Sequence, residues 1–173
     1  MVQAAKYSVI ELLRNGCPVE IRALRADDRA ELMTAIGRTS MQSLFRRFFI
    51  AKRGFTEQEI AFFLDIDFVH HVALVALVDE NGRQVIVAGG RYIVVQPDRA
   101  EVAFAVVDEY QGRGIGTALM RHLTGIAHAS GLNQLIAEVL PENIPMLKTF
   151  EKSGFRVSTK HEAGVVHVSL DLS

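Results

Sequence analysis

The chain has 173 residues, 49% of them hydrophobic, with 19 Lys and Arg against 20 Asp and Glu. This composition is typical of a globular chain and excludes an intrinsically disordered one. The net charge of -1 argues against a nucleic-acid-binding protein and against a polybasic membrane anchor, because both need a basic surface. The length suits one domain, so we expect residues 1–173 to form a single domain with residues 1–18 as an N-terminal strand and hairpin extension.

Cysteine usage and hydropathy indicate the compartment. The single cysteine, Cys17, cannot form a disulfide within the chain, which favours a reducing environment. No stretch approaches the roughly 18 consecutive apolar residues of a transmembrane helix. Residues 1–13 carry charges where a signal peptide would be apolar. We therefore expect a cytoplasmic protein with no membrane partner.

The first half of the chain predicts a β-hairpin followed by helices. In chain order, these are strands over 7–13 and 19–24 and helices over 27–36, 40–49 and from 56 onward. Asn15-Gly16 separates the two strands and favours a two-residue turn in which both residues have positive φ. Thr56 and Glu59 have the spacing of a capping box, which marks the start of the third helix.

The second half predicts strands that alternate with helices. In chain order, these are strands over 72–79, 84–95 and 101–107, a helix over 114–130, a strand over 135–140, a helix over 143–153, and strands over 156–160 and 165–172. Gly131 and Gly154 follow the two helices in the position of C-cap glycines. The pattern predicts an α/β fold with antiparallel strands first and a strand-helix-strand-helix-strand arrangement after them.

The most informative segment is Gln111-Gly112-Arg113-Gly114-Ile115-Gly116, between a predicted strand and a predicted helix. Glycines let backbone N–H groups approach a phosphate, and the helix N-terminus adds partial positive charge. The segment lacks the Gly-Lys-Ser/Thr of a Walker A loop and the spacing of a dinucleotide-binding loop. A glycine-rich turn without a ligand is the alternative. We favour an anion site, because alternate glycines weaken a helix start unless close approach is needed.

The same segment resembles the Q/R-x-x-G-x-G/A signature of the GCN5-related N-acetyltransferases, the GNAT family. Residues 143–155 resemble that family's second motif, in which Asn143 opens a helix that ends in Lys-x-Gly-Phe. The resemblance implies one GNAT domain over residues 1–173. Its fold would have a mixed, mostly antiparallel central sheet, flanking helices, and a splay between the two central strands that holds acetyl-CoA. The implied activity is acetyl-CoA-dependent N-acetyl transfer to a primary amine, with no metal.

A closer resemblance is to bacterial Pat-type protein lysine acetyltransferases, which carry a Ser-x-x-Ser-x-x-x-Arg-Phe-Phe helix. Ser40, Ser43, Arg47, Phe48 and Phe49 reproduce that spacing. This resemblance implies a protein lysine as acceptor, with an acyl-CoA synthetase type of protein as the partner, and leaves the oligomeric state open. Two alternatives remain: an acetyltransferase for small-molecule amines, and a sensor that binds acyl-CoA without turnover.

The family resemblance also implies which residues contact the donor. The backbone N–H near Val106 would polarise the thioester carbonyl, and the glycine loop would hold the pyrophosphate, with Arg113 as a further charged donor. The expected donor-binding residues are Phe104, Ala105, Val106, Val107, Gln111, Gly112, Arg113, Gly114, Ile115, Gly116, Thr117 and Asn143.

Two carboxylates are candidates for the general base. A lysine-like amine has a pKa of about 10.4, so a positioned base helps to free its lone pair at neutral pH. The resemblance implies Glu101 as the first choice, because it lies early on the strand beside the donor and matches the base position of the Pat-type enzymes. Glu138, at a position that other family members use for the base, is the second. A structural contact with a nearby Arg or backbone amide is the alternative role of either. Phe150 stands where many family members have a tyrosine general acid, so we expect no side-chain general acid. His122, on the long predicted helix, is interpreted as a surface residue.

Overall fold

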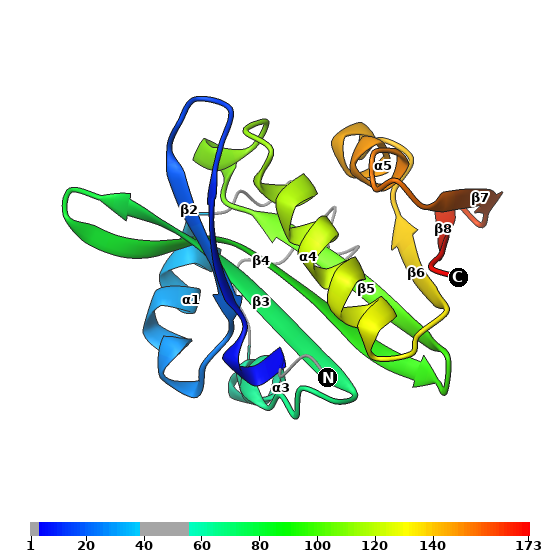
Figure 1. The fold of residues 1–173 in the computed structure, drawn as a ribbon, viewed down its shortest axis with the longest axis horizontal. Coiled ribbons are helices and arrows are strands. Elements are labelled where there is room, and N and C mark those ends of the chain that lie inside the picture. The colour runs from blue at the N-terminus through cyan, green and yellow to red at the C-terminus, as the bar shows by residue number, and fades with distance from the viewer. Residues whose placement is uncertain (1–3, 39–55) are drawn as a thin grey trace.

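The computed structural model describes residues 4–38 and 56–173. These residues form an eight-stranded sheet in the order β1-β2-β3-β4-β5-β6-β8-β7, flanked by helices (Figure 1). Neighbouring strands are antiparallel except β5 and β6, which are parallel. The α/β class and the mixed, mostly antiparallel sheet predicted from the sequence are confirmed.

The observed elements agree with the predicted ones to within a few residues. The strands are β1 (Ser8–Leu12), β2 (Pro18–Ala23), β3 (His71–Glu80), β4 (Arg83–Gln96), β5 (Arg99–Val106), β6 (Gln134–Val139), β7 (Arg156–Glu162) and β8 (Val165–Asp171). The helices are η1 (Ala4–Lys6), η2 (Ala26–Asp28), α1 (Arg29–Gly37), α3 (Glu57–Leu64), η3 (Asp108–Tyr110), α4 (Ile115–Ala129) and α5 (Ile144–Glu151). The helix predicted over 40–49, with the Pat-type serine and arginine pattern, lies outside the described residues.

Helices cover both faces of the central strands, and the side chains of β3 point alternately to one face and the other. Leu74 on one face packs in a core with Leu119 and Leu123 of α4, all nearly inaccessible to solvent. The neighbouring residue Val75 points to the opposite face and packs with Ala35 of α1. Burying each large aliphatic side chain stabilises the fold by roughly 1.5–3 kcal/mol. The sheet is therefore the middle layer of three.

The two Asn-Gly pairs of the chain form different turns. Between β3 and β4, Asn81 and Gly82 both have positive φ, 55° and 84°, and make a two-residue turn. Between β1 and β2, Gly16 has positive φ, 83°, but Asn15 does not. The Gly16 N–H donates to the Leu13 carbonyl at 2.8 Å. The two-residue turn predicted at residues 15–16 is therefore wrong. The loop has three residues, with a type I turn followed by a left-handed glycine, which matches the strand twist equally well.

The parallel pair β5–β6 separates part-way along its length. Backbone pairing joins Arg99 to Gln134, Ala100 to Leu135 and Glu101 to Ile136. Beyond that point β5 continues to Val106 and β6 to Val139, and the two strands diverge with α4 and α5 above them (Figure 1). This divergence is the splay that the family resemblance implies. Among the described residues, no helix is long and apolar enough to cross a membrane.

Candidate functional site

A cleft of about 780 Å³ opens where β5 and β6 separate. Its walls come from β5, the glycine loop, the first turns of α4, β6, α5 and the β1–β2 hairpin. All of the predicted donor-binding residues but one line it: Phe104, Ala105, Val106, Gln111, Gly112, Arg113, Gly114, Ile115, Gly116, Thr117 and Asn143. Val107 is outside this lining. Its side chain lies in the core, and its N–H donates to the Val87 carbonyl at 2.8 Å.

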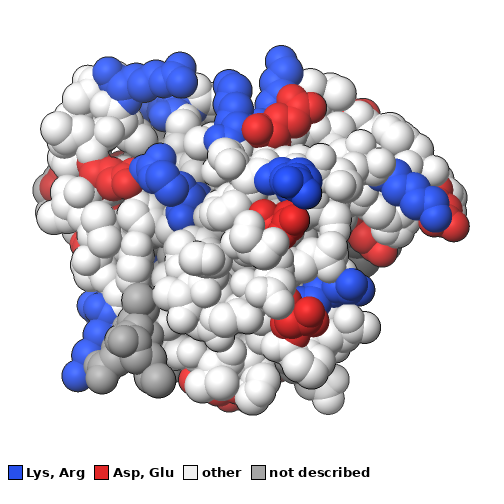
Figure 2. Space-filling model, turned by 45° about the vertical axis from the view of Figure 1, so that its right-hand side comes forward, with Lys and Arg blue, Asp and Glu red and all other residues white. Residues whose placement is uncertain are grey.

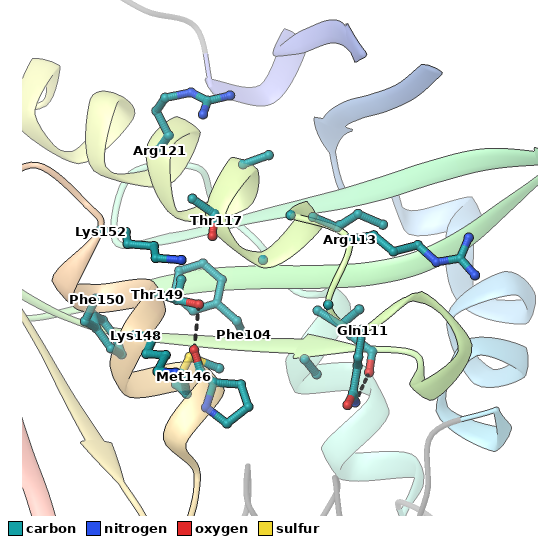
Figure 3. Close-up of a pocket in the computed structure, with 18 of the residues that line it drawn as sticks. Phe104, Gln111, Arg113, Thr117, Arg121, Met146, Lys148, Thr149, Phe150 and Lys152 are labelled. Atoms are coloured by element: carbon teal, nitrogen blue, oxygen red, sulfur yellow. Dashed lines mark hydrogen bonds between the residues drawn. The ribbon is translucent and has the colours of Figure 1, made fainter. Parts of the chain in front are cut away.

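The glycine loop has the backbone conformation that only glycine adopts without strain. Gly112 and Gly114 have φ of 76° and 89°, and Gly114 is the N-cap of α4. The Gln111 side chain donates to the Val106 carbonyl at 3.0 Å, which attaches the loop to the end of β5 (Figure 3). The first N–H groups of an α-helix have no intrahelical acceptor, so the α4 N-terminus presents donors at the cleft. This arrangement fits an anionic ligand.

Basic side chains add to the positive charge of the cleft, but the sequence predicted a role in donor binding for only one of them. The guanidinium of that residue, Arg113, stacks 4.7 Å from the centre of the Tyr110 ring. Arg121, Lys148 and Lys152 also line the cleft, and Figure 3 shows Lys152 reaching from α5 toward α4. Figure 2 shows Lys and Arg side chains gathered along the upper edge of one face. These cations were missed because helix residues distant in sequence meet only in the folded chain.

Tyr110 connects the glycine loop to the β3–β4 hairpin. Its hydroxyl donates to Glu80 at 2.6 Å, and Arg38 donates to both oxygens of the same carboxylate at 3.0 and 2.8 Å. The hydrogen bonds from Arg38 and Tyr110 hold the pKa of Glu80 below its usual range. The bond to Glu80 is also the main reason why the pKa of Tyr110 is raised. Hydrogen bonds through Glu80 therefore attach Tyr110, the residue before the glycine loop, to both Arg38 and the β3–β4 hairpin.

The N-terminal hairpin forms another wall of the cleft. His122 of α4 was interpreted as a surface residue, but its side chain is only 11% exposed. One ring nitrogen contacts the Tyr7 hydroxyl, and the other lies 2.8 Å from a carboxylate oxygen of Glu11. Arg121, one residue earlier, also donates to Glu11. Glu11 and Arg121 both line the cleft, so β1 is tied to α4 at its rim.

The second family motif closes the cleft from the other side. The Asn143 side chain accepts from the Met146 N–H at 3.4 Å and caps α5. Phe150 is 2% exposed and packs edge-on against Phe104, with ring centres 6.3 Å apart. Both rings line the cleft, which places an apolar surface where a tyrosine hydroxyl would otherwise project.

The two candidate bases lie together where the strands divide. Glu101 is the last β5 residue paired to β6, and Glu138 lies just beyond the pairing on β6. Both are exposed to solvent. Both line the large cleft and also a second cavity of about 290 Å³. Glu138 has a partner, His167 of β8, whose Nδ1 is 3.8 Å from its Oε1. The Glu101 side chain makes no hydrogen bond or ion pair with another described residue.

No group of three His, Cys, Asp or Glu side chains in residues 4–38 and 56–173 is arranged to hold a metal ion. The groups that converge on the splay are backbone donors, cations and carboxylates. They can hold an anionic ligand on one side and accept a proton on the other.

Comparison with known proteins agrees with this geometry. Residues 38–155 match the Acetyltransferase (GNAT) family. An acetyltransferase of Pseudomonas aeruginosa is 34% identical over 127 residues, which are 73% of this chain and 68% of that protein. The acetyltransferase Pat of Mycolicibacterium smegmatis is 32% identical over 135 residues, 77% of this chain but only 39% of Pat.

The solved structures include a similar domain. The GNAT domain of PAT from S. lividans superposes with a TM-score of 0.86 at 32% identity, covering 95% of this chain and 96% of that domain. The splayed sheet, the glycine loop and the asparagine-capped helix thus occur together in a chain whose relatives carry the same domain. This chain is a member of the GNAT family of acetyltransferases and is similar to its Pat-type branch.

Proposed function

We propose that this protein transfers the acetyl group of acetyl-CoA to a primary amine, the side chain of a protein lysine. The observation that carries the proposal is the pair of cavities that meet at Glu101 and Glu138, one of about 780 Å³ and one of about 290 Å³. The larger cavity has the size of a cofactor site. Its glycine loop, helix N-terminus and cations suit the phosphates of coenzyme A.

Acetyl-CoA supplies the acetyl group as a reactive thioester, and the protein orients it and removes a proton. The amine nitrogen bonds to the acetyl carbon, the carbon–sulfur bond breaks, and the thiolate leaves. We assign the ammonium proton to Glu101, because this carboxylate lies at the division of the strands and faces both cavities. Glu138 has His167 beside it and is assigned a supporting role.

A lysine side chain suits the smaller cavity better than a complete small molecule does. A volume of about 290 Å³ is at the lower limit for a small-molecule pocket. It accommodates an unbranched alkylamine while the rest of the acceptor stays outside. The resemblance to the Pat-type acetyltransferases supports the same acceptor.

Incubation with labelled acetyl-CoA and a lysate of bacterial proteins tests the function. We expect label in protein bands, and label confined to small amines would overturn the lysine acceptor. Glu101→Gln should lower the rate about 100-fold or more while the Kd for acetyl-CoA, measured by calorimetry, stays unchanged. Glu138→Gln is the matched control and should retain most of the rate. A wild-type protein that binds acetyl-CoA but transfers nothing would indicate a sensor.

A further inference from the structure

The smaller cavity carries charge of both signs. Glu101 and Glu138 lie at its junction with the large cleft, and Lys160 of β7 lines it as well. Glu101 alternates along β5 with Val102, which packs in the core beneath α4. The carboxylate therefore faces away from α4, and the cavity lies on the opposite side of the sheet from that helix.

The charges follow one row across three neighbouring strands. Glu138 of β6 is directly opposite His167 of β8, and His167 is directly opposite Lys160 of β7. Side chains at directly paired positions lie on the same face of a sheet. Two inter-strand spacings separate the carboxylate from the ammonium along this row, about 10 Å between the backbones. The inner end of the cavity is therefore negative and its outer end positive.

The Lys160 charge is only partly compensated. Its Nζ is 3.4 Å from Glu162 Oε2, and both side chains are largely exposed, at 75% and 61%. A surface ion pair of this kind is weak and leaves the ammonium able to attract a second anion. An acceptor with its amine at Glu101 and Glu138 that follows the cavity outward would pass this ammonium.

We propose that Lys160 is a specificity determinant that selects acceptor lysines with an acidic residue close by in their sequence. This inference rests on the proposed function and extends it to the class of acceptor. The inner carboxylates attract the acceptor ammonium, and Lys160 attracts the carboxylate of the neighbouring acidic residue. A polyamine, whose second ammonium would face Lys160, is disfavoured for the same reason.

Three synthetic peptides test this proposal. Each contains one lysine in an otherwise identical sequence, and the residues that flank it on both sides are Asp, Gln or Arg. We expect kcat/KM to fall in the order Asp, Gln, Arg, with roughly a fivefold difference between the extremes, the size expected for exposed charges. The difference should shrink as salt is added, because salt screens surface charges.

Two variants link the preference to one side chain. Lys160→Glu should reverse the order of the three peptides, whereas Arg156→Glu, a charge reversal on the same strand outside the cavity, should leave it unchanged. Thermal unfolding and the Kd for acetyl-CoA verify that both variants are folded. Equal kcat/KM for the three peptides, or an unchanged order in Lys160→Glu, would overturn the proposal. Failure of all three peptides despite acetyl-CoA binding would overturn the lysine acceptor itself, and this inference with it.

Discussion

The large cleft and the small cavity meet at the same two glutamates but are built differently. The side of the cleft that we assign to the phosphates has a backbone framework within residues 111–117, a loop whose glycines have positive φ and a helix N-terminus. The small cavity is made of side chains from β5, β6, β7 and β8. A backbone site depends on a local conformation, whereas a side-chain site depends on the pairing of distant strands.

The two kinds of construction differ in how easily substitutions change them. Backbone donors bind any ligand with the right anion, and exchanging surface side chains hardly alters them. Strand side chains such as Lys160 and His167 can change without disturbing the sheet, because both have solvent-accessible side chains. We infer that the donor side is set by the fold and the acceptor side by a few exposed residues.

Replacing a loop glycine is the strongest test of the backbone side. Gly114→Ala forces a left-handed conformation on an L-residue, which costs about 1–2 kcal/mol. We expect the Kd for acetyl-CoA to rise about tenfold as the loop relaxes away from its φ of 89°. Isothermal calorimetry measures this change.

Gly131→Ala is the matched control. Gly131 follows the other end of α4 with φ of 88°, and like Gly114 it has no heavy atom within 4 Å of an added Cβ. The two variants should therefore lose similar stability to urea, but Gly131→Ala should keep the wild-type affinity. Equal loss of affinity in both would mean that the loop conformation has no special part in binding.

The network behind the loop should have a smaller effect. Glu80→Ala removes the acceptor of both Arg38 and Tyr110, and we expect acetyl-CoA to bind about threefold more weakly, as for the loss of a hydrogen bond. Glu31→Ala breaks an ion pair with Arg83, the residue paired with Glu80 on the same hairpin. It leaves the bonds from Arg38 and Tyr110 to Glu80 in place and should leave the affinity unchanged. If both variants bind acetyl-CoA like the wild type, the contacts of Glu80 with Arg38 and Tyr110 stabilise the hairpin but do not contribute to binding.

The same carboxylate gives a pH dependence of known sign. The pKa of Glu80 is lowered in the folded protein, mainly by its hydrogen bonds from Arg38. Its contribution to stability is therefore complete above the ordinary carboxyl pKa of about 4.3 and is lost as the pH falls through the lowered value. The stability difference between wild type and Glu80→Ala in urea should be largest near neutral pH and should shrink in acid.

Phe150→Tyr should have the smallest effect on catalysis. A thiol leaves as a thiolate without a proton donor when its pKa is near 8.5. We therefore expect kcat to change by less than about twofold on restoring the phenol. Steady-state rates across neutral pH check this, and a tenfold gain would show that the wild-type reaction is limited by the missing acid.

Local sequence patterns determined several helix starts and turns, including those of the donor side. The capping box at Thr56 and Glu59 is present, with both of its hydrogen bonds formed. The glycine loop and the asparagine cap of α5 lie where their spacing placed them. These features were predictable because turns, caps and helix starts depend on residues within a few positions of one another.

Only the tertiary structure decided the rest of the site. The contact of His122 with Tyr7 and Glu11 joins residues more than a hundred positions apart. The row from Glu138 through His167 to Lys160 depends on the register of three strands. No local pattern encodes a register between distant strands, because it follows from which faces the whole core buries. The sequence alone therefore determined the fold class and the glycine loop and offered the two glutamates as candidates, and the packing of the sheet decided what surrounds them.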